Sequence, residues 1–147
     1  MASTDTNEIL TLSIRRQFKA SVDAVFKAWT DAEQVSQWFA PTAGFSVKVP
    51  LMDVQAGGKY RIEMTNPDGE TYIAVGEYIE VSEPSKVVFT WAWEGGDEGM
   101  RVTLDFQACK GGTELILTHE QFPDAGSRDH HDEGWTGCLA GLEKFLA

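Results

Sequence analysis

The 147-residue sequence is poor in cysteine and has no long apolar run. Its two cysteines, Cys109 and Cys138, lack metal-motif spacing, and we interpret them as small apolar core residues in a reducing compartment, with a disulfide or a reactive thiol as alternatives. The longest stretch without a charged residue, 34–47, has 14 residues, too few for a membrane span. The N-terminus also lacks the basic start and apolar run of a signal peptide, so we expect a cytoplasmic protein.

Basic residues are scarce as well. There are 12 Lys and Arg against 23 Asp and Glu, a net charge of −11. Such a chain repels phosphate backbones and anionic lipid surfaces, so we expect neither nucleic acid nor a membrane as partner. Aromatic residues, in contrast, make up 11% of the sequence. The length suits one domain, and we expect a single domain over residues 9–147 after a flexible N-terminus at 1–8.

The first third of the chain has the pattern of one strand and two short helices. A strand is predicted where apolar residues alternate with polar ones, at Leu10, Leu12 and Ile14. Ser21 and Asp31 are expected to cap the two helices that follow, because their side chains accept hydrogen bonds from free backbone N–H groups.

The rest of the chain predicts six strands and a long helix. Between residues 45 and 121, alternating apolar residues are separated by Gly, Pro and Asn turns typical of antiparallel hairpins. The pattern over residues 72–81 leaves open which face points inward. The last helix is expected to have Ser127 as cap, and helical spacing places one set of residues on its inner face, namely His131, Trp135, Cys138, Leu142 and Phe145.

Several short motifs, taken in order, resemble one protein family. They are Arg16-Gln17-Phe18, Trp38-Phe39, Phe89-Thr90-Trp91, Leu117-Thr118-His119 and His131-Asp132-Glu133-Gly134-Trp135. This order and spacing is similar to homologues of the activator of the heat-shock-protein-90 ATPase, in the START-like (SRPBCC) superfamily. The resemblance implies an α+β helix-grip fold, a curved antiparallel sheet of about seven strands around a long C-terminal helix, with two short helices after the first strand. It also implies a cavity between helix and sheet.

Inward-facing residues define a candidate ligand site. Arg16, His119 and His131 share faces with apolar residues and are expected to anchor a carboxylate or phenolate head group. The expected walls are mainly aromatic: Trp38, Phe39, Tyr60, Met64, Trp91, Phe106 and Trp135. The alternative interpretation is a filled core, with the histidines hydrogen-bonded to neighbours and Arg16 paired with an acid.

Metal and catalytic sites are less well supported by the sequence. Residues 129–133 supply ligand side chains, but the adjacent His130 and His131 diverge by about 100° on a helix, so we expect no metal site and no cofactor. No Gly-x-Ser-x-Gly motif is present. No catalytic residue is assigned, although acid–base chemistry by His119 or His131 stays open.

The sequence therefore predicts a protein that binds an apolar or aromatic small molecule in a closed cavity between the last helix and the sheet. Two alternatives stay open. One is an enzyme of the cyclase or hydrolase type that uses the same cavity. The other is a chaperone-linked or stress-response module that binds another protein. The sequence does not distinguish a monomer from a homodimer.

Overall fold

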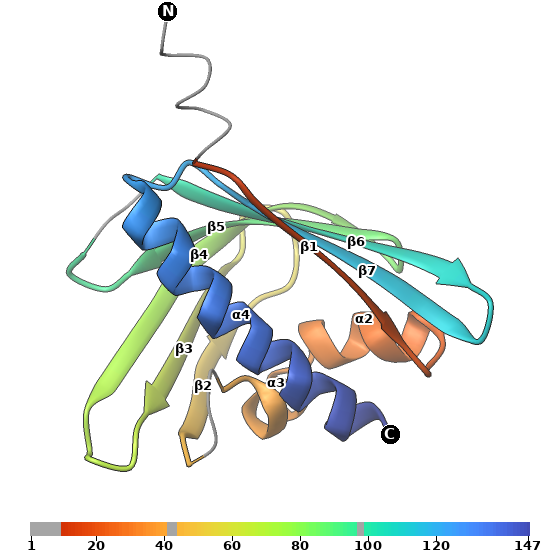
Figure 1. The fold of residues 1–147 in the computed structure, drawn as a ribbon, viewed down its shortest axis with the longest axis horizontal. Coiled ribbons are helices and arrows are strands. Elements are labelled where there is room, and N and C mark those ends of the chain that lie inside the picture. Colours follow the sequence, from red (N-terminus) through yellow and green to blue (C-terminus); the bar gives the residue numbers. More distant parts are fainter. Residues whose placement is uncertain (1–9, 41–43, 97–98) are drawn as a thin grey trace, which may run out of the picture.

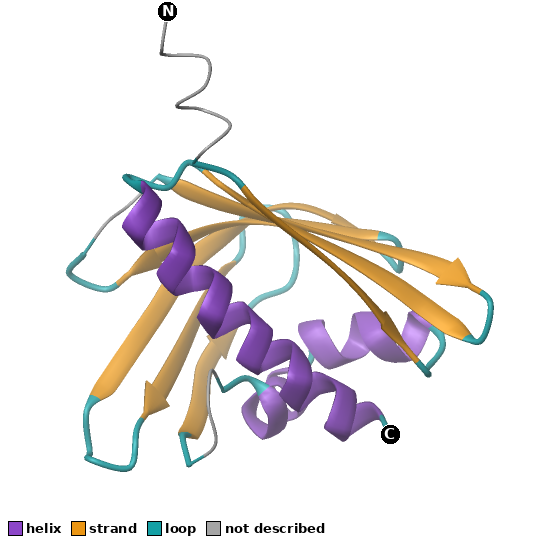
Figure 2. Cartoon of the chain, in the orientation of Figure 1, coloured by secondary structure: helices purple, strands orange, loops and turns teal. Residues whose placement is uncertain are grey.

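The computed structural model describes residues 10–40, 44–96 and 99–147, and its helices and strands follow the predicted order (Figures 1 and 2). The expected flexible N-terminus at residues 1–8 lies outside these ranges. The elements are β1 (Leu12–Phe18), α2 (Val22–Thr30), α3 (Ala32–Trp38), β2 (Ser46–Met52), β3 (Lys59–Thr65), β4 (Thr71–Ser82), β5 (Lys86–Trp93), β6 (Met100–Cys109), β7 (Gly112–Glu120) and α4 (Ala125–Leu146).

The strands form one antiparallel seven-stranded sheet in the order β1-β7-β6-β5-β4-β3-β2. The sheet curves so that its two halves diverge around α4, which crosses its concave side, with α2 and α3 near the C-terminal end of that helix (Figure 1). This is the helix-grip arrangement that the resemblance implied. None of the helices among the described residues is long and apolar enough to cross a bilayer.

The helix caps were predicted correctly for the short helices and wrongly for the long one. Ser21 Oγ accepts a hydrogen bond from the N–H of Ala24, and Asp31 Oδ1 accepts one from the N–H of Glu33, both at 3.2 Å. The cap of α4 is Asp124 rather than Ser127, because the Asp124 carboxylate accepts the N–H of Ser127 at 2.7 Å and the helix begins one turn earlier.

A register shift resolves the ambiguous strand β4. The pairing with β5 slips between Tyr78 and Glu80, which is the signature of a β-bulge. Before the bulge, Ala74 and Tyr78 face the core, whereas Ile79 is left 49% exposed. The change of face within one strand is the reason why its apolar residues fit no single alternation.

The C-terminal half of α4 is held by close contacts with α3 and β1. A methyl group at Gly141 would lie 2.8 Å from the carbonyl oxygen of Trp38, so glycine allows the helix to approach α3. Two residues further on, Glu143 pairs with Arg16 of β1 at 2.6 Å. The strand-end ion pair considered for Arg16 is therefore present.

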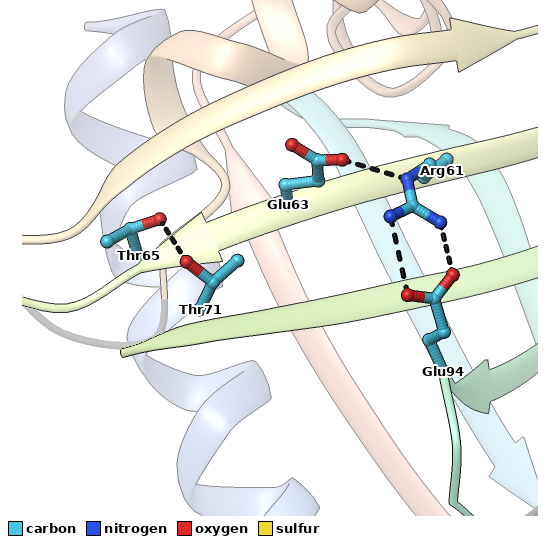
Figure 3. A network of polar contacts seen from close by, with 5 residues as sticks. All are labelled: Arg61, Glu63, Thr65, Thr71 and Glu94. Carbon is cyan, nitrogen blue, oxygen red and sulfur yellow. Dashed lines mark hydrogen bonds and ion pairs between the residues drawn. The ribbon is translucent and has the colours of Figure 1, made fainter. Parts of the chain in front are cut away.

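The outer face of the sheet carries a polar network at β3, β4 and the end of β5 (Figure 3). The guanidinium of Arg61 hydrogen-bonds Glu63 at 2.8 Å and contacts both carboxylate oxygens of Glu94. The hydrogen bond from Arg61 is the main reason why the pKa of Glu94 is lowered. Because residues alternate along β3, the side chains of Arg61 and Glu63 point away from α4.

Candidate ligand-binding cleft

A cleft of about 730 Å³ lies between the first half of α4 and the concave side of β3, β4 and β5. It is partly open to solvent, whereas the sequence predicted a closed pocket. Six of its fifteen lining residues are Phe, Tyr or Trp, namely Phe39, Phe45, Tyr72, Trp91, Trp93 and Trp135. The space is not filled by side chains, so the core-only interpretation does not hold for this part of the molecule.

Half of the predicted site residues line this cleft. Trp91 and Trp135 face each other across the helix–sheet contact with ring centroids 5.0 Å apart, and Phe39 lies 5.7 Å from Trp135. Met64 of β3 and His131 of α4 complete this set. These five residues come from β3, β5, α4 and the end of α3, which only the tertiary fold brings together.

The other half lie outside the cleft, and each has a different partner. Arg16 is paired with Glu143 near the far end of α4. The Trp38 indole N–H donates to the carbonyl oxygen of Ala28 at 2.9 Å.

Tyr60 and Phe106, two further residues predicted for the site, pack in the core. Tyr60 donates its hydroxyl to the carbonyl oxygen of Thr90 at 2.6 Å and lines a second space of only about 20 Å³. Phe106 packs edge-on against Phe26, with ring centroids 5.5 Å apart. Both residues therefore belong to the filled core rather than to the predicted wall of a ligand site.

His119 is the fifth residue outside the cleft, fully buried behind the aromatic wall. Its Nδ1 accepts the indole N–H of Trp135 at 3.0 Å, and its ring stacks on Phe122. Burial, followed by the neighbouring His131, lowers the pKa of His119 to about 3. The imidazole is therefore neutral near pH 7 and carries its proton on Nε2, which has no partner among the described residues. Its one lone pair is already used, so this histidine does not serve as a general base.

His131 is also committed to internal hydrogen bonds. Its Nε2 accepts the indole N–H of Trp93 at 3.0 Å, and its Nδ1 donates to the carbonyl oxygen of Ser127 at 2.7 Å. One acceptor and one donor nitrogen describe a neutral ring. His131 thus orients Trp93, which lines the cleft. Of the three groups expected to form one anionic-ligand anchor, the two histidine rings lie 4.9 Å apart, but only His131 lines the cleft and Arg16 is paired elsewhere with Glu143.

Several lining residues were not predicted as site residues, although some of them share a helix face with the predicted His131. Ser127, His131, Gly134 and Cys138 follow the 4-3-4 spacing of one helix face, and all four line the cleft. No local pattern identifies Asn66 and Pro67, because they belong to the β3–β4 turn, which only the sheet's curvature brings to the cleft.

Both cysteines are free of disulfides, and burial raises the pKa of the Cys138 thiol. Within residues 10–40, 44–96 and 99–147, no three His, Cys, Asp or Glu side chains gather as metal ligands would.

Comparison with solved structures shows the same fold in bacterial proteins. A protein from Chromobacterium violaceum is 25% identical over 93% of this chain and 96% of its own, with a TM-score of 0.86. An AHSA1 protein from Silicibacter pomeroyi is 29% identical over 92% of this chain and 96% of its own, with a TM-score of 0.82. A protein from Staphylococcus epidermidis is 28% identical over 93% and 89%, with a TM-score of 0.78. These likenesses confirm the helix-grip fold.

A search of curated protein sequences found no match. A family model, in contrast, matches residues 19–147, from the end of β1 to the C-terminus. The match covers both short helices, the remaining six strands and α4, and thus every element that forms the cleft. The chain therefore belongs to the family described as activator of Hsp90 ATPase homolog 1-like proteins.

Proposed function

We propose that the protein binds an apolar or aromatic small molecule in the cleft between α4 and strands β3 to β5. The observation that carries this proposal is the unfilled space of about 730 Å³ with an aromatic wall. Small-molecule sites usually have volumes of roughly 300–1,000 Å³ and mostly apolar linings with a few polar groups. Here the polar lining residues are Asn66, Ser127, His130, His131 and Glu133, and the other lining residues are mainly apolar.

We propose binding rather than catalysis because the acceptor nitrogens of the two buried histidines are already engaged in hydrogen bonds. His119 is neutral with its lone pair taken by Trp135, and His131 spends both ring nitrogens on Trp93 and Ser127. A general base needs a free lone pair within reach of the substrate proton. Neither imidazole offers one in this arrangement.

The proposal is tested by filling the cleft with one side chain. We expect the wild-type protein to bind the neutral fluorescent probe N-phenyl-1-naphthylamine saturably, at one probe per chain. In Gly134→Leu, a leucine enters the cleft from α4, and we expect the affinity to fall about tenfold or more. Leucine has a higher helix propensity than glycine, by roughly 1 kcal/mol, so weaker binding should not reflect unfolding.

The matched control places the same residue on the opposite face of the helix. Thr136 is exposed and does not line the cleft, so Thr136→Leu should bind the probe as the wild type does. Fluorescence titration with equal protein concentrations compares the three proteins. The proposal is wrong if the wild type shows no saturable binding, or if both leucine variants lose affinity equally.

A second candidate function follows from the family match itself. The family's description names activation of the Hsp90 ATPase, and a chain with a net charge of −11 favours a basic docking surface on a partner. If this chain acts in that way, it should raise the rate of ATP hydrolysis by purified Hsp90, and the increase should shrink as salt screens the charges. An unchanged hydrolysis rate at low salt would exclude this function.

A further inference from the structure

We propose that the cleft selects organic cations, that is, apolar or aromatic molecules that carry an ammonium-type charge. This inference rests on the proposed function and adds the chemical class of the ligand. It reverses the sequence-based expectation of a carboxylate or phenolate, because the residues that were to hold an anion do not meet in the cleft.

The aromatic rings that line the cleft are turned to different angles. Trp91 lies nearly perpendicular to Trp93, at 82° with ring centroids 5.4 Å apart, and it is tilted by 50° against Trp135. Phe39 is nearly perpendicular to Trp135, at 87°. Rings turned to different angles around one space present π faces from several directions. A cation within about 6 Å of such a face is attracted by the negative face of the ring, most strongly by tryptophan.

The charge of the residues that line the cleft also favours a cation. Glu133 lies on the α4 side of the cleft, and its exposed carboxylate forms no ion pair with any residue that the structure describes. No lysine or arginine is among the described residues that line the cleft. An anionic ligand would find no fixed countercharge there, whereas a cation would find both a carboxylate and aromatic faces.

Two features at this end of α4 could favour an anion, and neither is strong. The helix N-terminus carries positive dipole charge, but the Asp124 carboxylate already accepts the N–H of Ser127 there. Of the two lining histidines, His131 is neutral in its hydrogen-bonded arrangement with Trp93 and Ser127. His130 is exposed at the edge of the cleft and opposes a cation only when protonated. Binding should therefore be measured at pH 8, above the range in which histidine ordinarily titrates.

The test compares three probes with the same naphthalene ring. They are (2-naphthylmethyl)trimethylammonium, its uncharged carbon isostere 2-neopentylnaphthalene, and the anion 2-naphthylacetate. Equilibrium dialysis at pH 8 and about 0.15 M salt limits long-range effects of the overall charge to roughly 8 Å. We expect the cation to bind about three- to tenfold more tightly than the isostere, and the anion to bind about tenfold more weakly than the isostere.

A pair of variants tests whether the preference for the cation comes from the Glu133 carboxylate. Glu133→Gln removes the charge at the cleft, and should lower the ratio of the cation's affinity to the isostere's affinity about threefold. Asp132→Asn makes the same change in net charge on the neighbouring exposed residue, which does not line the cleft, and should leave both affinities unchanged.

The outcomes separate the two proposals. If the isostere and the cation both fail to bind, the proposed ligand-binding function itself is wrong. If the isostere binds but the cation binds no more tightly, or the anion binds best, only the cation selectivity is overturned. Equal losses in Glu133→Gln and Asp132→Asn would likewise overturn it, because the effect would then come from the overall charge of the protein.

Discussion

Replacing His119 with glutamine is expected to remove much of the acid sensitivity of the fold. The pKa of His119 is lowered to about 3, compared with an ordinary histidine value of about 6.5. Between these two pH values the unfolded chain binds a proton at this position and the folded protein does not. Each pH unit of acidification in this window therefore lowers the free energy of unfolding by about 1.4 kcal/mol, or roughly 4–5 kcal/mol in total by pH 3.

The expected result is a pair of stability curves that cross. Glutamine replaces the ring whose Nδ1 accepts the Trp135 indole N–H and which stacks on Phe122, so both contacts are altered. We therefore expect His119→Gln to be less stable than the wild type at pH 7.5, by about 1–2 kcal/mol. Because glutamine does not titrate, the difference should shrink on acidification and change sign near pH 5.

Urea unfolding at half-unit steps from pH 4 to pH 8 measures both curves. His130→Gln is the matched control, because it removes an exposed histidine one residue from His131, and its curve should stay parallel to that of the wild type. Parallel curves for His119→Gln and the wild type would contradict the assignment of the acid sensitivity to this buried imidazole.

Gly76→Ala is expected to destabilise the fold by about 3 kcal/mol or more. A methyl group at this position would lie 2.0 Å from the carbonyl oxygen of Thr90 and 2.6 Å from the Tyr60 hydroxyl. The same carbonyl accepts the hydroxyl proton of Tyr60, which is buried at this point beneath β4. Two backbone segments and a buried ring would have to shift to admit one carbon atom.

A second glycine distinguishes this steric cost from the general effect of adding a side chain. Gly57 adopts a positive φ of 87°, but a methyl group there meets no atom within 4 Å. Gly57→Ala should therefore cost only about 1–2 kcal/mol, from the left-handed backbone conformation. Thermal unfolding followed by circular dichroism compares the two variants, and equal losses of stability would show that contact with Thr90 and Tyr60 is not the cause.

The order of elements was predictable because each depends on residues close together in the sequence. Alternation over three side chains identified each of β3 and β6, and a single side chain capped each short helix at Ser21 and Asp31. The start of α4 was placed wrongly because Asp124 and Ser127 are both good caps, and the extended backbone at Asp124 decides between them.

The cleft was only partly predictable because inward facing does not distinguish a cavity wall from a filled core. Tyr60 and Trp91 both face inward, yet Tyr60 is covered by β4 at Gly76 and Trp91 borders open space. That difference depends on the distance between α4 and the strands, which no local pattern determines. His119 is paired with Trp135 and Arg16 with Glu143, and both partners lie in α4. These contacts could not be predicted from the sequence either, because they join elements far apart in the chain.

The two halves of α4 have different roles. Its C-terminal half is anchored through Gly141 and Glu143, whereas its N-terminal half supplies Ser127, His130, Glu133 and Gly134 to the cleft. Substitutions at these four positions need not disturb the two anchoring contacts. The fold therefore offers protein engineers, and evolution, a binding surface whose chemistry can be exchanged while the attachment of the helix is kept.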